Sequence, residues 1–103
     1  MKKLILSLAL VTSSVYANWD DPLKPFDASK NIYDTVTVKW LAVSNLQQVC
    51  EAESKKRGKG GFGYAVNACS FWEGNTCTII TSQKPSMHSL GHEVRHCFQG
   101  NWH

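Results

Sequence analysis

The alternation of apolar and polar residues predicts three strands in this chain. From Thr35 to Val43, apolar side chains such as Trp40 alternate with polar ones, which is the two-residue period of a strand with one buried face. Residues 64–72 and 76–81 are rich in aromatic and β-branched residues and are separated by Glu73-Gly74-Asn75. These two segments therefore predict a β-hairpin.

Two helices are predicted between and after these strands. Ser44-Asn45-Leu46-Gln47 fits a capping box, so we expect a helix that starts there and ends before Gly58. A second helix is expected from Met87 to Phe98, with Ser86 as its cap and Gly100 beyond its end. The order strand-helix-strand-strand-helix predicts an α+β fold, in which two helices cover one face of a small mixed or antiparallel sheet.

The N-terminus has the composition of an export signal. Lys2-Lys3 precede an apolar run from Leu4 to Val11, and Val15-Tyr16-Ala17 supplies small residues at a cleavage site. We therefore expect a signal peptide at 1–17, an extended arm at 18–32 and a single domain at 33–103. The apolar run is too short for stable membrane insertion, so the expected product is exported, either periplasmic or secreted.

Charge and glycine patterns argue against nucleic-acid and nucleotide partners. The formal charge of +3 falls to about +1 when Lys2 and Lys3 are removed with the signal, and nucleic-acid binding would require a strongly basic face. The segment Gly58-Lys59-Gly60-Gly61-Phe62-Gly63 matches the dinucleotide-binding pattern. However, it follows a helix and leads into a strand, which is the reverse of the required context. We interpret it as a flexible, solvated connection.

Four cysteines predict two disulfides in an exported protein of this size. They are Cys50, Cys69, Cys77 and Cys97, and three pairings are possible. One hypothesis pairs Cys69 with Cys77 across the hairpin, which leaves Cys50 and Cys97 to join the two helices. The other pairings remain open. The sequence contains no C-x-x-C pair, so a cysteine metal site is disfavoured.

All four histidines lie in the last sixteen residues, and two of them form a metal-binding pattern. His92 and His96 are four residues apart, so a helix projects both rings from one face, and Glu93 lies beside them. His92-Glu93-Val94-Arg95-His96 is the H-E-x-x-H motif, in which two imidazoles bind zinc and the glutamate is a general base. His88 lies near the same face and is an alternative ligand or a solvated residue at the helix start.

The segment from Ser89 to Phe98 resembles the active-site helix of zincin metallopeptidases. The tail that ends in Gly100-Asn101-Trp102-His103 resembles the metzincin extension, although the glycine and the last histidine each come one residue later. The resemblance implies a Zn²⁺ ion bound by His92, His96 and His103, with Glu93 as the catalytic base. It also implies that the preceding hairpin contains the edge strand that holds the substrate.

The expected function is that of a small exported zinc-dependent hydrolase, a minimal metallopeptidase that cleaves peptide bonds in a peptide or a peptidoglycan stem. The alternative is a non-catalytic, zinc-stabilised and disulfide-containing envelope or binding protein. A third class, a disulfide-rich module without metal, follows if the motif is accidental. Glu93 favours the enzyme, because a structural zinc site has no use for a carboxylate beside its first ligand.

Overall fold

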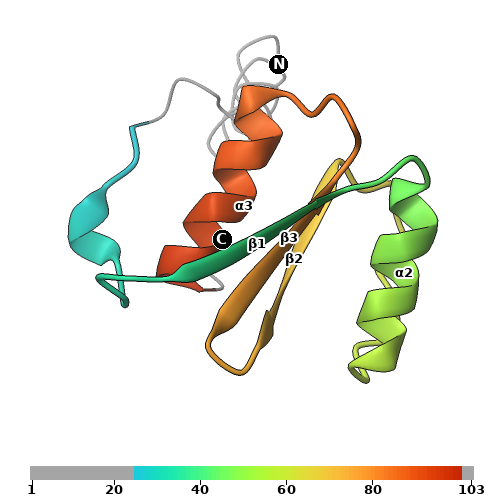
Figure 1. Ribbon diagram of the computed structural model, residues 1–103, viewed down its shortest axis with the longest axis horizontal. Helices are drawn as coiled ribbons and strands as arrows, with labels where there is room; N and C mark the ends of the chain where they lie inside the picture. Colours follow the sequence, from blue (N-terminus) through green and yellow to red (C-terminus); the bar gives the residue numbers. More distant parts are fainter. Residues whose placement is uncertain (1–24, 101–103) are drawn as a thin grey trace, which may run out of the picture.

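The computed structural model describes residues 25–100 of the chain (Figure 1). A short 3-10 turn, η1 (Ala28–Lys30), leads into strand β1 (Thr37–Ala42) and helix α2 (Leu46–Lys56). The hairpin of β2 (Ala68–Glu73) and β3 (Thr76–Thr81) follows, and helix α3 (Met87–Gln99) comes last. The α+β class and the predicted order of strands and helices are confirmed. The predicted signal peptide and the start of the arm lie outside the described residues.

The three strands form one mixed sheet in the order β1-β3-β2. β3 lies in the centre, where it pairs with β1 in parallel and with β2 in antiparallel fashion. Its side chains from Cys77 to Thr81 are all buried, whereas every residue of β1 is exposed. β2 is the other edge strand of the described sheet.

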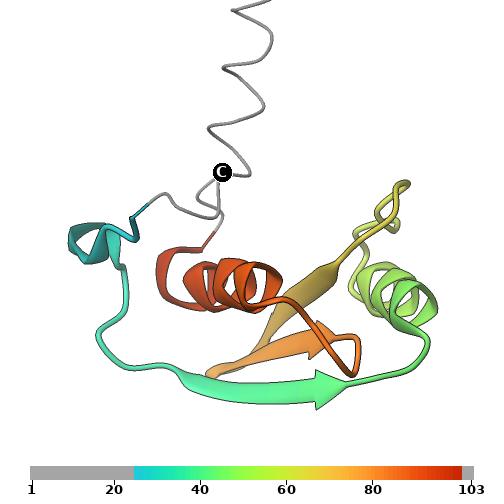
Figure 2. The ribbon, with the colours of Figure 1, turned by 90° about the horizontal axis from the view of Figure 1, so that it is seen from above.

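The two helices pack on opposite faces of the sheet, where the sequence led us to expect both on one face (Figure 2). The pleat of the strands explains the difference, because neighbouring residues of a strand point to opposite faces. Ile80 of β3 joins Cys50 of α2 in one buried cluster, and Ile79 joins Cys97 of α3 in the other. β3 is apolar on both sides, so each side requires a helix to cover it.

The two disulfides are Cys50–Cys69 and Cys77–Cys97. Two bridges were predicted and are confirmed, but the hypothesis that paired Cys69 with Cys77 is wrong. In the hairpin, Cys69 lies opposite Ile80, three residues along β3 from Cys77. The side chains of Cys69 and Cys77 therefore point to opposite faces of the sheet. Each cysteine of the hairpin meets the helix on its own face, so each bridge fixes one helix to the sheet.

The helix starts agree with the sequence in one case and differ in the other. At α3, the Ser86 hydroxyl accepts a hydrogen bond from the Ser89 amide, as predicted. At α2, the cap residue is Asn45, whose side chain makes no capping bond. The expected capping box does not form, because Gln47 uses its side chain to bind the loop that follows α2.

None of the helices within residues 25–100 has the length and apolar character needed to cross a membrane. The disulfides are typical of proteins in oxidising compartments. The disulfides are consistent with the predicted export but do not show it.

Candidate metal centre

Helix α3 carries two half-buried histidines on the same side. His92 and His96 are four residues apart, which in a helix is a rotation of about 40°, and their ring centroids lie 5.0 Å apart. The apolar residues of α3 lie on another side, where Leu90, Val94 and Phe98 pack around the buried Cys97. The same helical periodicity that buries one side against the sheet therefore displays the two imidazoles together.

Glu93 lies between the histidines and the core. Its position in the helix is about 100° from His92 and about 60° from His96, and only 8% of its surface is exposed. Burial raises the pKa of Glu93, while a hydrogen bond with the Ser70 side chain of β2 and the nearby His96 ring act in the opposite direction. A glutamate at this position is thus held by the sheet next to the imidazoles instead of extending into solvent.

The end of α3 orients the His96 ring. Gly100 ends the helix with a φ of 67° and a ψ of −138°, so the chain turns there with a positive φ, as expected of a residue without Cβ. Its carbonyl oxygen lies 2.7 Å from Nδ1 of His96. When Nδ1 donates to this carbonyl, the ring lone pair is on Nε2, the nitrogen available to a metal. A backbone carbonyl that holds a ligating histidine in this way is a common feature of metal sites.

His92, Glu93 and His96 form a group that could hold a metal ion. One ligand atom from each residue can be chosen so that all three lie within 4.8 Å of one another. A tetrahedral ion with bonds of about 2.0–2.1 Å requires nitrogen atoms about 3.4 Å apart, a separation that lies within this limit. The two histidines and the glutamate of the sequence motif are thus brought together as the motif predicts.

Of the remaining two histidines, the structure describes His88 but not His103. The His88 ring lies 6.5 Å from the His92 ring, centroid to centroid, and His88 is not a member of the three-residue group found among residues 25–100. His103, the predicted third ligand, lies outside the described residues. Its role stays a prediction.

The metal group lines one wall of a groove of about 830 Å³. The groove extends around the outer edge of β2, since it includes Ser70 and Trp72 from the face that α3 covers and Cys69 and Phe71 from the other face. Figure 2 shows β2 between the two helices, with its outer edge turned away from β3. α3 therefore forms the wall that contains the imidazoles, and α2 with its following loop forms the opposite wall.

The glycine-rich segment after α2 is exposed at Gly58, Lys59, Gly60 and Gly63, as a solvated connection would be, but Gly61 and Phe62 are bound to α2. Polar side chains of α2 bind the backbone of this segment and of the residues that follow it at four points. These bonds join Ser54 Oγ to Gly61 N (3.1 Å), Glu51 Oε2 to Phe62 N (3.0 Å), Gln47 Nε2 to Tyr64 O (2.9 Å) and Gln47 Oε1 to Val66 N (2.8 Å). In the sequence, the four-residue spacing of Gln47 and Glu51 indicates that their side chains lie on the same side of α2. It does not identify the backbone groups that they bind, because these groups are distant in sequence.

The segment before β1 supports the end of α3 that contains His96. The buried Gln99 side chain donates to the carbonyl of Asp27 and to the side chain of Asn31, each at 2.8 Å. The Phe98 carbonyl accepts from the Ile32 amide at 2.9 Å. This part of the predicted arm is therefore packed against α3, where it satisfies a buried amide and a helix-end carbonyl that would otherwise be costly to bury.

Comparisons of the chain with protein-family models, with curated proteins and with solved structures give no match.

Proposed function

We propose that this protein is an exported metal-dependent hydrolase that binds zinc through His92 and His96 and cleaves peptide bonds with Glu93 as its base. The observation that carries the proposal is the position of the buried Glu93 carboxylate. It lies beside two half-buried imidazoles on the wall of an open groove. A structural zinc site has four protein ligands and is closed, whereas a group on a groove wall can admit water and substrate.

The donor set fits zinc. Two imidazole nitrogens on one helical face are ligands that zinc prefers, and the carbonyl of Gly100 would hold His96 with Nε2 toward the ion. His103 is proposed as the third protein ligand, and the positive φ of Gly100 would permit the chain to turn back toward α3. When bound, zinc would supply Lewis acidity that lowers the pKa of water and polarises a carbonyl group.

Glu93 would then act as the proton carrier of the reaction. Its carboxylate would accept a proton from the attacking water and deliver this proton to the nitrogen of the leaving amine. The Ser70 hydroxyl, which is hydrogen-bonded to Glu93, would orient the carboxylate between these two positions. Under this proposal, Ser70 of β2, which the motif alone did not identify, would have a positioning role.

The choice of a peptide substrate is supported by the edge strand. β2 has one side paired with β3, and its other edge borders the groove next to Glu93. An extended peptide can add to such an edge through main-chain hydrogen bonds. The scissile bond would then lie close to the imidazoles without a deep pocket, which a domain of this size has little room to form.

The test combines metal analysis with one substitution. The protein without its signal peptide is expected to hold close to one zinc per chain and to lose it in His96→Ala. Glu93→Gln should keep the zinc and the fold but reduce the hydrolysis of a broad panel of peptides and peptidoglycan stems by about 100-fold or more, because it removes the base and no ligand. Glu73→Gln is the matched control, since that carboxylate is 68% exposed, and it should keep full activity.

Two outcomes would contradict the proposal. Negligible zinc after reconstitution at neutral pH would remove the metal site. Bound zinc with equal inactivity of the wild type and Glu93→Gln would instead favour the non-catalytic zinc-stabilised protein. The third ligand is tested separately by comparing the zinc affinities of a chain that lacks His103 and of His88→Ala.

A further inference from the structure

The wall of the groove opposite the metal group includes the segment 59–66, which we call the recognition loop. Its backbone is fixed by Gln47, Glu51 and Ser54 of α2, as described above. The loop can approach α2 this closely because Gly61 lacks a side chain: a Cβ on that residue would collide with the Glu51 carboxylate. The backbone of Gly61 also has a φ of 89°, which disfavours any other residue.

The recognition loop displays aromatic side chains at the groove. Phe62 contacts the ring of Phe71 edge to face at 6.4 Å, so it is anchored in the core cluster on the α2 side. Tyr64 contacts the ring of Phe62 at 5.9 Å and remains 66% exposed. The backbone that follows its ring is bound at its own carbonyl and at the Val66 amide. A large exposed ring on a fixed backbone can bind a partner with little further ordering cost.

We propose that the recognition loop selects the substrate by binding a bulky apolar side chain, with Tyr64 and Phe62 as its contacts. The inference rests on the proposed function and specifies the substrate class of the same site. Apolar residues that also line this wall include Ala65, Val66 and Phe71. A wall of this composition gains free energy mainly by removing apolar surface from water.

The position of the loop on the α2 face gives the selectivity a definite pattern. Side chains of an extended peptide alternate between the two sides of its backbone. A peptide added to the edge of β2 would direct every second side chain toward the recognition loop and the others toward α3. Of the two residues that flank the scissile bond, only one should show the preference for a bulky apolar side chain.

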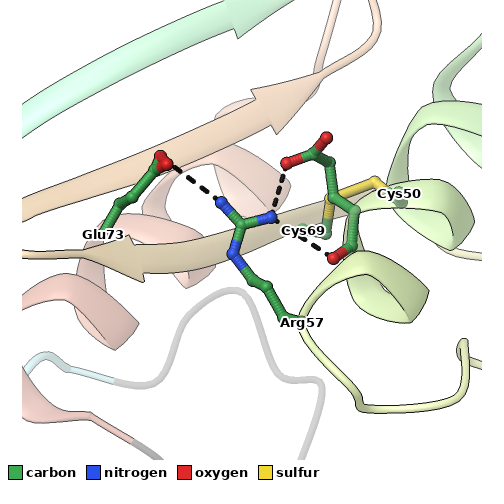
Figure 3. A network of polar contacts seen from close by, with 5 residues as sticks. Cys50, Arg57, Cys69 and Glu73 are labelled. Carbon is green, nitrogen blue, oxygen red and sulfur yellow. Dashed lines mark hydrogen bonds and ion pairs between the residues drawn. A yellow bond between two sulfur atoms is a disulfide. The ribbon is translucent and has the colours of Figure 1, made fainter.

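An acidic side chain is the competing occupant, because Arg57 and Lys59 also line this wall. The Arg57 guanidinium is already engaged by the carboxylates of Glu53 and Glu73 (Figure 3) and lies 4.7 Å from the centre of the Phe71 ring. Lys59 is therefore the cation that an acidic substrate side chain would meet. Lys59→Ala separates the two possibilities without altering the aromatic contacts.

The experiment uses the zinc-loaded protein and matched peptides that carry Phe, Leu, Ala or Glu on either side of the scissile bond. Wild type is expected to cleave the Phe and Leu peptides at least 10-fold faster in kcat/KM than the Ala peptide, at one of the two positions only. Tyr64→Ala should remove about 10-fold from the Phe peptide and leave both the Ala peptide and the zinc content unchanged. Gly61→Ala, which displaces the loop, should have the same selective effect, and Lys59→Ala should have none.

Binding measurements separate this inference from the proposed function. The same peptides are titrated against zinc-loaded Glu93→Gln, with and without Tyr64→Ala. A preference for Phe over Ala that depends on Tyr64 supports the recognition loop even if no peptide is cleaved. The inference is overturned if Phe and Ala peptides bind and react equally, or if the preferred peptide carries Glu and the preference disappears in Lys59→Ala.

Discussion

The two disulfides provide a controlled test of how α3 is held for metal binding. Cys50–Cys69 and Cys77–Cys97 span 19 and 20 residues, and all four cysteines are at most 2% exposed. One pair fixes α2 to the sheet, and the other fixes α3 beside His96. Replacing either pair by alanine therefore removes a bridge of nearly the same loop length and burial, but only one replacement affects the metal helix.

The expected loss of stability is nearly the same for both double variants. In the chain-entropy model, closing a loop of this length stabilises the folded state by about 3 kcal/mol. With a urea dependence of about 1 kcal/mol per molar for a small domain, each variant should show a midpoint lowered by about 3 M. The two variants should differ in zinc affinity. Cys77→Ala with Cys97→Ala should weaken binding by about 10-fold, the lower end of the range of about 10- to 100-fold found when groups that orient ligands are lost. Cys50→Ala with Cys69→Ala should keep it.

The assays are urea unfolding of the metal-free proteins, and zinc competition with a chromogenic chelator in the absence of denaturant. Circular dichroism under the binding conditions checks that both variants are folded. If the two variants lose zinc affinity equally, the Cys77–Cys97 bridge has no specific role at the metal group. If neither loses affinity, the packing of α3 on the sheet suffices to hold His92 and His96.

Two further predictions concern the ends of the helices. Gly100→Ala should destabilise the fold by about 1–3 kcal/mol in urea unfolding, because φ is 67° and ψ is −138°, a region almost restricted to glycine; an unchanged midpoint would mean that the turn relaxes easily. The hydrogen bond from Arg57 lowers the pKa of Glu53, so Glu53 stabilises the fold above its ordinary pKa and loses this effect as the pH falls through the lowered value. Glu53→Gln should then cost less than about 1 kcal/mol at pH 7, since the side chain is partly exposed, and the difference from wild type should vanish in acid; a cost that persists there would contradict the ion-pair explanation.

The elements of the fold could be read from local patterns. β3 (Thr76–Thr81) coincides with its predicted range, and α3 extends the predicted helix by one residue. These predictions succeed because backbone periodicity, the Ser86 cap and the Gly100 helix end act over a few neighbouring residues. The capping box predicted at Ser44 does not form, because the interactions of Gln47 are with residues distant in sequence. Gln47 has a local partner available in sequence, but the recognition loop, seventeen to nineteen residues away, provides its partners in the folded chain.

In the candidate site, too, some features follow from local sequence and others from tertiary packing. The sequence by itself determined that His92, Glu93 and His96 share one region of a helix, because a spacing of one and four residues fixes their relative angles. Only the tertiary structure decided that Glu93 would be buried against Ser70, that Cys97 would pair with Cys77, and that α2 would lie on the other face of the sheet. These outcomes depend on which side chains of β2 and β3 face each helix. One residue of register in the sheet exchanges the two faces, so strand pairing and packing, which join residues distant in sequence, fix what local patterns leave open.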